Sequence, residues 1–272
     1  MQRFKTFVLF FITYWEFKLS SAVQINYIKV PSAVKNDSGS PVILDCNYSV
    51  RPDDSELVVK WLLNDEVVYQ WIPPQKPQSL GRLKNRVDLS YKAVTDDPKS
   101  VYRAMKIWNP TTDIAGEYRC FVSTFADEDF SVKNMIVFEP ERSLVILKQE
   151  FNHQSVNFTC YANEVYPAPK LILYKDRTDD FYNKNPLQTL EWNTSRHPNG
   201  RFSVFVVAHA MVDSLAPGTL IHCELRIPGT GYVKKRSLLY YPTAQTGCGR
   251  VLDRCSAQLV SILCLLILAF SI

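Results

Sequence analysis

Apolar and polar residues alternate through several short stretches of the chain, and this alternation is its strongest structural signal. Val42, Leu44 and Cys46 fall on one side of an extended chain, and the residues between them fall on the other. The same period of two surrounds Trp61 and Cys160. Successive side chains of a β-strand point to opposite faces, so this period is typical of a half-buried strand. The pattern predicts an all-β protein.

Two further strands are predicted before residue 124. Met105 and Ile107 read as the inward positions of one strand. Tyr118 and Cys120 read as the inward positions of another, which the chain enters through Gly116. Each strand would place an apolar stripe on one face of a sheet, as a sandwich core requires.

The N-terminal residues have the pattern of a secretory signal peptide. A basic start is followed by an apolar run and small residues, with Ser20 and Ala22 at the positions that precede a cleavage site. We expect residues 1–22 to be removed and the mature chain to begin at Val23. A membrane anchor is the alternative, but the apolar run is shorter than the roughly 20 residues that span a bilayer.

The C-terminal residues have the pattern of a glycosylphosphatidylinositol (GPI) anchor signal. Small residues at 247–249 precede a polar spacer, 250–258, and an apolar tail, 259–272, which is short for a membrane span. We expect the lipid on Gly247 and removal of the tail. The alternatives are a short transmembrane helix and attachment near Ser256, which would leave no spacer.

Both ends indicate the secretory pathway, where disulfides form and persist. Of the seven cysteines, those at 248, 255 and 264 would leave with the C-terminal propeptide. Four remain, and an even number suits an oxidising compartment. They are Cys46, Cys120, Cys160 and Cys223. Four cysteines permit three pairings.

The segments around these cysteines resemble immunoglobulin domains. The hallmarks of that family are a cysteine, a tryptophan on the following strand, and a tyrosine two residues before the second cysteine. Here they are Cys46, Trp61, Tyr118 and Cys120. The resemblance implies the disulfides Cys46–Cys120 and Cys160–Cys223. Cys46 and Cys120 are 74 positions apart, whereas Cys160 and Cys223 are 63 apart. The longer separation in the first domain leaves room for an additional strand at 67–74, so a variable-type domain is expected.

The sequence departs from the family pattern in three places. Variable-type domains often pair an arginine with an acid six residues before the second cysteine, but Ile114 stands in that slot and Asp113 lies one residue earlier. The offset argues against a pair between Asp113 and Arg86. In the second domain Leu173 replaces the tryptophan and Ile221 the tyrosine, so the cysteines and the alternation carry that assignment.

The expected architecture is all-β, with two tandem immunoglobulin-like β-sandwiches, the first variable-type and the second constant-like. Pro140 interrupts the strand pattern within 138–143 and marks the boundary between them. The expected order is a signal peptide at 1–22, the first domain at 23–139, the second at 140–243, and a short stalk with the anchor signal at 244–272.

Four N-x-[ST] sequons suit a secreted glycoprotein. They begin at Asn36, Asn47, Asn157 and Asn193. Asn47 and Asn157 adjoin inward residues on their strands, so alternation places both on outer faces, where N-glycosylation needs them.

Several segments resemble the beaten path family of insect neuronal immunoglobulin proteins. They are IKVPSAV, VKW, VVYQWIPPQKPQ and GEYRCFVS in the first domain and CYANEVYPAPKLILY in the second. The likeness covers most of residues 25–225 as architecture, but only these segments as motif, and it departs at Leu173 and in FVSTFADEDF after Cys120. It implies axon guidance or neuronal recognition through binding of an immunoglobulin-type surface receptor.

No catalytic, cofactor or metal site is expected, and the chain is not expected to be an enzyme. The histidines form no zinc-ligand spacing, and the sequence has no nucleophile elbow or phosphate loop. His222 adjoins Cys223 on a strand, which predicts an outward-facing surface histidine. The acid pairs at 53–54 and 179–180 are expected in solvated loops, with calcium binding as the alternative.

The expected binding surface is the outer face of one sheet of the first domain. Alternation assigns to it the residues that point away from Trp61 and Cys120, which are Lys60, Leu62, Glu117, Arg119 and Phe121. Apolar residues at solvent-facing positions indicate an interaction patch, and aromatic and arginine side chains are favoured at interface hot spots. Tyr69 and Trp71 are expected to extend the patch. Coverage of this face by the second domain or by a loop is the alternative.

The formal net charge is +4, but much of it lies in the two end segments, so the body of the chain is nearly neutral. Nucleic-acid binding needs many phosphate-neutralising cations, so the charge argues against it. The predicted function is recognition or adhesion at the extracellular face of the plasma membrane, through binding a partner that is itself an immunoglobulin-type surface protein. The alternatives are a soluble secreted binder with an immune or scavenger role and a single-pass membrane receptor.

Overall fold

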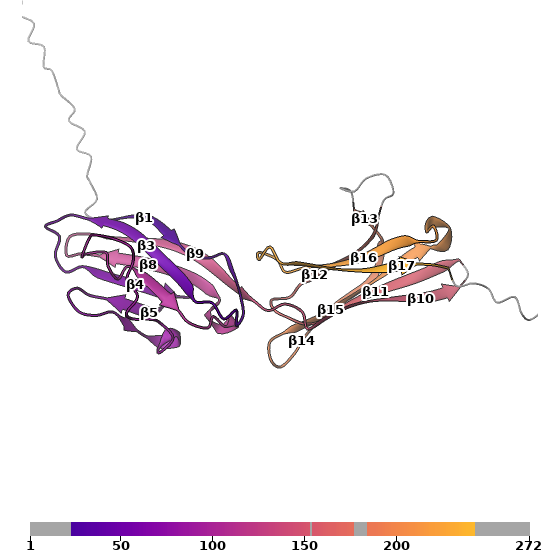
Figure 1. Ribbon diagram of the computed structural model, residues 1–272, viewed down its shortest axis with the longest axis horizontal. Coiled ribbons are helices and arrows are strands. Elements are labelled where there is room, and N and C mark those ends of the chain that lie inside the picture. The colour runs from indigo at the N-terminus through magenta and orange to yellow at the C-terminus, as the bar shows by residue number, and fades with distance from the viewer. Residues whose placement is uncertain (1–22, 153, 177–183, 243–272) are drawn as a thin grey trace, which may run out of the picture. The chain divides into compact units, whose positions relative to one another are not determined.

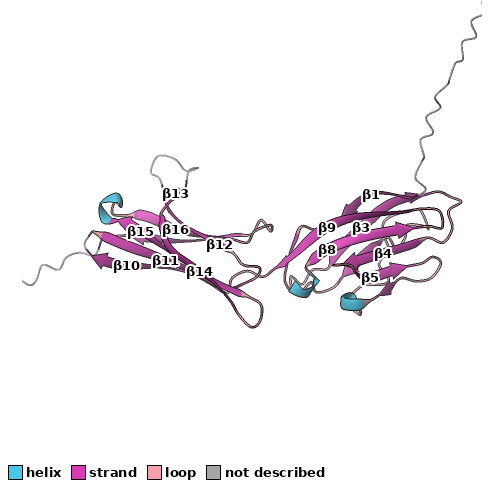
Figure 2. Ribbon diagram, turned by 180° about the vertical axis from the view of Figure 1, so that it is seen from behind, coloured by secondary structure: helices cyan, strands magenta, loops and turns pink. Residues whose placement is uncertain are grey.

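The computed structural model describes residues 23–152, 154–176 and 184–242 (Figure 1). The predicted signal peptide, the predicted anchor residue Gly247 with the apolar tail, and the acid pair at 179–180 lie outside the described residues. Strands dominate the described part of the chain, and its helices are single 3-10 turns (Figure 2). The chain divides into two compact units, with the main division between Pro140 and Glu141, inside the predicted boundary stretch.

The first unit is a sandwich of two sheets. One is three-stranded with the order β1-β3-β7, and the other is six-stranded with the order β2-β9-β8-β4-β5-β6. The additional strand predicted from 67–74 is present as β5, which pairs antiparallel with β4. The elements are β1 (Val23–Lys29), β2 (Ala33–Lys35), β3 (Val42–Val50), β4 (Val58–Leu63), β5 (Glu66–Trp71), β6 (Gln78–Ser79), η1 (Gly81–Leu83), β7 (Ala104–Ile107), η2 (Thr112–Ile114), β8 (Gly116–Ser123) and β9 (Glu128–Phe138).

The core of the first unit lies around the Cys46–Cys120 disulfide, whose Cα atoms are 6.3 Å apart. Trp61 is fully buried and pairs with Cys120 across β4 and β8. Tyr118 is also fully buried, and its hydroxyl donates to the backbone carbonyl of Ile114 at 2.8 Å. This bond is the tyrosine corner of immunoglobulin sandwiches. The core residues inferred from alternation are therefore confirmed.

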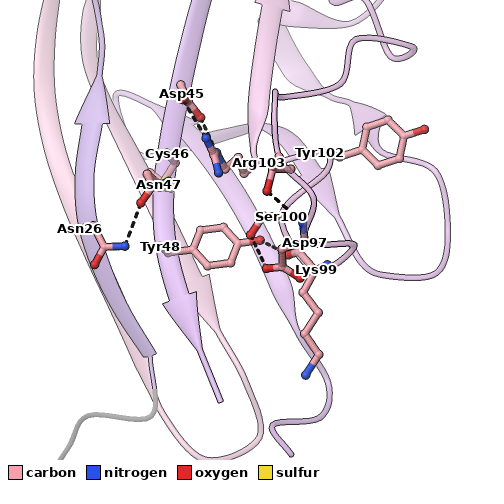
Figure 3. Close-up of polar contacts among 12 residues, drawn as sticks. Asn26, Asp45, Cys46, Asn47, Tyr48, Asp97, Lys99, Ser100, Tyr102 and Arg103 are labelled. Atoms are coloured by element: carbon pink, nitrogen blue, oxygen red, sulfur yellow. Dashed lines mark hydrogen bonds and ion pairs between the residues drawn. A yellow bond between two sulfur atoms is a disulfide. The ribbon is translucent and has the colours of Figure 1, made fainter. Parts of the chain in front are cut away.

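Polar side chains hold the long connection between β6 and β7 against β3 (Figure 3). Arg103 Nε lies 2.9 Å from the Asp45 carboxylate on β3, and both side chains are largely buried. Tyr48, also on β3, donates its hydroxyl hydrogen to the carbonyl of Lys99 at 2.6 Å. The indole Nε1 of Trp61 donates to the Arg103 carbonyl at 3.2 Å. An irregular segment is thus tied to strands of both sheets.

The ion pair that the spacing argued against is present. Arg86 Nη1 lies 2.7 Å from Asp113 Oδ2, and Arg86 Nη2 donates to the Thr111 hydroxyl at 2.6 Å. Asp113 lies in the 3-10 turn η2, where the tight winding leaves its carboxylate at the surface while Ile114 points into the core. The turn therefore absorbs the one-residue offset that the sequence pattern shows.

The second unit is a sandwich of two four-stranded sheets, with the orders β10-β11-β15-β14 and β13-β12-β16-β17. This arrangement matches the predicted constant-like sandwich, in which strands A, B, E and D face strands C, F and G. The elements are β10 (Ser143–Asn152), β11 (Ser155–Val165), β12 (Lys170–Lys175), β13 (Asn185–Pro186), β14 (Gln188–Arg196), β15 (Phe202–Met211), η3 (Val212–Ser214), β16 (Thr219–Arg226) and β17 (Val233–Tyr240).

The core of the second unit forms without the usual tryptophan and tyrosine. The Cys160–Cys223 disulfide is present, with Cα atoms 6.0 Å apart. Leu173 and Ile221 are buried at the two substituted positions. Phe158 on β11 and Tyr240 on β17 meet edge to face, with ring centroids 6.1 Å apart. These two rings supply the aromatic bulk that Trp61 and Tyr118 supply in the first unit.

The prediction that His222 is a surface residue is wrong, because its side chain is only 3% exposed. Alternation correctly places it away from the core, but cross-strand neighbours cover it. Tyr174 on β12 stacks on the imidazole with ring centroids 5.1 Å apart. Ser237 of β17 lies 2.7 Å from Nδ1, and Asp176, which follows β12, lies 2.8 Å from Nε2.

Candidate binding surface

The six-stranded sheet of the first unit brings the predicted surface residues together. Lys60 of β4 pairs with Phe121 of β8, and Leu62 pairs with Arg119. Directly opposed residues on neighbouring strands project on the same side of a sheet. All four project away from the core and are half-buried, so each retains contact with solvent. We call the outer side of this sheet, centred on these four residues, the outer face.

The outer face continues onto β9, which sequence reasoning did not include. Phe130 pairs with Phe121, and Val132 pairs with Arg119. Phe130 is 59% exposed, and Phe125, in the turn of the β8–β9 hairpin, is 81% exposed. The pairing partner of a strand cannot be read from its own alternation, so nothing in the sequence indicated that β9 joins this face. The result is an apolar centre of Leu62, Phe121, Phe130 and Val132 with an exposed aromatic at the hairpin tip.

Arg119 is fixed in the middle of this apolar centre. Its guanidinium lies 3.1 Å from the Asp65 carboxylate and 3.5 Å from that of Glu117. It also lies over the ring of Phe130, with the guanidinium carbon 5.5 Å from the centroid. A guanidinium that is already oriented loses less side-chain freedom when a partner binds.

The prediction that Tyr69 and Trp71 extend the outer face is wrong. Both point into the core, and they are 1% and 2% exposed. Tyr69 pairs with Trp61 and Trp71 pairs with Val59, so each shares the inward side of its partner. The hydroxyl of Tyr69 and the indole N–H of Trp71 each donate to a backbone carbonyl of the first unit, at 2.8 and 3.0 Å.

A β-bulge explains why the sequence did not settle the direction of these side chains. The register between β4 and β5 shifts between Trp61 and Leu62. A bulge inserts one unpaired residue, so side chains beyond it change face relative to simple counting. Gln70, opposite Lys60, and Val67, opposite Leu62, are the β5 residues that pair with outer-face residues instead.

None of the four sequon asparagines is on β4, β8 or β9, the strands at the centre of the outer face. Asn47 is on β3 of the opposite sheet, where the Asn26 side-chain amide donates to it at 2.8 Å. Asn36 follows β2 and its backbone N–H donates to the carbonyl of Phe138. Asn157 and Asn193 are on β11 and β14 of the second unit. A glycan on Asn47, on the opposite sheet of the same unit, would leave the outer face uncovered.

A concave surface lies on the three-stranded sheet of the first unit. It is an open depression of about 440 Å³, lined among others by Tyr27, Ile43, Asp45 and Arg103. Two of its charged groups, Asp45 and Arg103, already pair with each other. It is therefore a weaker candidate for protein binding than the apolar outer face, and Ile43 offers a position from which to test it.

The part of the chain that the structure describes shows no group of three or more histidine, cysteine, aspartate or glutamate side chains placed to hold a metal ion. Within the same residues, no helix combines the length and apolar character that a membrane crossing requires.

Comparison with known proteins shows the fold. No family model matches the chain, and no curated protein sequence matches it. The crystal structure of bovine butyrophilin aligns with 79% of this chain and 98% of that chain, at a TM-score of 0.57 and 16% identity. The extracellular portion of mouse CD200RLa aligns with 77% of this chain and 99% of that chain, at a TM-score of 0.46 and 15% identity. The chain consists of two immunoglobulin-like β-sandwiches.

Proposed function

We propose that this chain is a non-enzymatic cell-surface recognition protein that binds another immunoglobulin-type surface protein through the outer face of its first unit. The observation that carries the proposal is the outer face itself. It joins an apolar centre to a fixed arginine, and its central strands β4, β8 and β9 carry no sequon, whereas the opposite sheet of the same unit has one at Asn47. Fully desolvated aromatic and arginine side chains are the usual anchors of protein interfaces.

The sizes of the exposed side chains support such an interface. Fully burying a phenylalanine contributes about 1.5–3 kcal/mol. Phe130 is 59% exposed, so covering the remainder would contribute roughly 1–2 kcal/mol. Phe121 is already half-buried and would contribute less by area. We therefore expect Phe130 to be as important an anchor as Phe121.

The setting we propose is neuronal recognition, including axon guidance. The support is the likeness of the segments at 28–34, 67–78, 116–123 and 160–174 to the beaten path family. The bovine butyrophilin likeness, at 16% identity, bears on the fold and not on this setting.

The first experiment is a binding screen. The secreted ectodomain, made as a labelled tetramer, is tested on cells that each display one immunoglobulin-type surface protein, including this chain itself. We expect Phe130→Ala, Phe121→Ala and Leu62→Asp each to reduce binding at least tenfold without altering the melting temperature. The matched control is Ile43→Asp on the opposite sheet, which should bind normally. Loss of binding with Ile43→Asp alone would place the interface at the depression on the three-stranded sheet.

We also propose that the chain is tethered at the extracellular face of the plasma membrane through a GPI anchor on Gly247. Phosphatidylinositol-specific phospholipase C should release the anchored protein from cells. Retention on the membrane with an intact 259–272 tail would indicate a transmembrane receptor. Appearance of the protein in the medium without the enzyme would indicate a soluble binder.

A further inference from the structure

The first residue of β1 lies against a carboxylate of the β8–β9 hairpin. The backbone nitrogen of Val23 is 3.4 Å from Asp127 Oδ2, and that of Ile25 is 2.7 Å from Asp129 Oδ2. Residues two apart on a strand direct their N–H groups to the same edge. The side chain of Val23 is 1% exposed, so its packing in the core fixes the position of the nitrogen.

Signal-peptide cleavage would change the chemistry of this nitrogen. Hydrolysis of the Ala22–Val23 amide bond consumes one water, leaving a carboxylate on Ala22 and an α-amino group on Val23. An α-amino group ordinarily titrates near pH ~8, so it is mostly an ammonium at neutral pH. A neutral amide with one N–H thereby becomes a cation with three, and a charge-assisted hydrogen bond is roughly twice as strong as a neutral one.

We infer that the processed N-terminus is a structural element of the mature protein: the α-ammonium of Val23 pairs with Asp127 and fastens the β8–β9 hairpin to β1. The inference rests on cleavage at the position that the sequence predicts, and it does not depend on which partner the chain binds. The unprocessed chain has only the amide contact, so leader removal itself tightens the hairpin.

The hairpin is the part of the outer face that gains most from such a clamp. Its turn is closed by the Thr124 N–H donating to the Asp127 carbonyl at 2.9 Å. Phe125 at the tip donates its own N–H to the Ser55 carbonyl at 3.0 Å, while its ring stays exposed. Asp127 also accepts from the Glu128 N–H at 2.9 Å, so the carboxylate bridges the turn and β1. A clamped turn would present Phe125 and Phe130 in one orientation.

A four-way comparison of full-length chains secreted from cultured cells tests the clamp. The four chains are the native one, one with Gly-Ser inserted between Ala22 and Val23, and each of these with Asp127→Asn. The insertion keeps an amide at Val23 and moves the ammonium away, and asparagine keeps the shape and one acceptor oxygen. Mass spectrometry of each N-terminus establishes where cleavage occurred. Amide hydrogen exchange of the peptide covering 124–130 then reports hairpin opening.

We expect the insertion and Asp127→Asn each to raise exchange of the hairpin amides by roughly five- to tenfold, with no further increase when they are combined. Asp129→Asn is the control, because its partner is the Ile25 amide, and it should act equally with or without the insertion. Equal effects of Asp127→Asn in native and extended chains would overturn the clamp. A mature chain that begins elsewhere than Val23 would overturn the cleavage on which it rests, and neither result depends on partner binding.

Discussion

The tyrosine corner gives the sharpest test of how the first unit is stabilised. Tyr118→Phe removes one oxygen and keeps the ring, so core packing is nearly unchanged. The lost bond runs from a fully buried hydroxyl to the Ile114 carbonyl at 2.8 Å. Leaving a buried acceptor without its donor costs about 1–3 kcal/mol. For a unit of this size each kcal/mol lowers the melting temperature by about 4 °C.

The assay is unfolding of the secreted ectodomain in urea, followed by tryptophan fluorescence. Trp61 and Trp71 are buried in the first unit, whereas Trp192 in the second unit is 71% exposed and changes its surroundings little on unfolding. The fluorescence signal therefore reports mainly the first unit. We expect a lower urea midpoint with an unchanged slope, because the exposed area on unfolding stays the same.

The matched control is Tyr91→Phe, whose half-buried ring lies beneath the Lys106 ammonium at 5.6 Å and would keep that contact. It should change the free energy of unfolding by less than about 0.5 kcal/mol, as most surface substitutions do. A Tyr118→Phe variant as stable as the Tyr91→Phe variant would refute the assignment of this bond as a principal stabiliser of the turn before β8.

Two pH-dependent predictions follow from buried groups. Burial raises the pKa of Tyr48, Tyr69 and Tyr118 above the ordinary value of 10.0, so the unfolded chain loses these protons first. The contribution of these tyrosines to the free energy of unfolding should be fully present below pH 10 and should fall as the pH rises beyond it. Urea midpoints measured at increasing pH will show this loss. In the second unit, burial alone would raise the pKa of Glu224, but hydrogen bonds from Lys184 and Arg226 lower it below 4.5. The contribution of the Glu224 carboxylate to the free energy of unfolding should be present above pH 4.5. It should be lost as the pH falls through the lowered pKa. Glu224→Gln should remove that acid-dependent part, and an unaltered acid profile in this variant would contradict the assignment.

Much of the fold could be predicted because strand alternation is a local property. The inward positions of β3, β4, β8 and β11 follow from apolar residues two apart, and the hallmark residues Trp61 and Tyr118 occupy the core as expected. The outer-face positions of Leu62, Arg119 and Phe121 follow from the same parity. These predictions needed no knowledge of which strands are neighbours.

The predictions for Tyr69, Trp71 and His222 failed because they depend on contacts between neighbouring strands. Tyr69 and Trp71 turned inward because a bulge shifts the register of β5. His222 is buried because Tyr174 and Ser237 cover the outer side of β16. The contact between Val23 and Asp127 joins residues that are far apart in the sequence. Periodicity carries no information about any of these, since each depends on pairing across strands.

A glycan placed on the outer face tests the central claim most directly. Phe121→Asn completes an N-x-S sequon with Ser123, so one substitution directs a bulky glycan to the middle of the face. The matched control adds Ser123→Ala, which keeps the asparagine and removes the sequon. A second control, Asn47→Gln, removes a predicted glycan from the opposite sheet.

The measurement is binding of each secreted ectodomain to the partner found in the screen, after a glycosidase mobility shift has verified glycan occupancy. We predict that the glycosylated Phe121→Asn protein keeps a native melting temperature and loses binding completely. The unglycosylated control should keep weakened binding, and the Asn47→Gln protein should bind normally. Native affinity of the glycosylated Phe121→Asn protein would contradict the assignment of the outer face as the binding surface.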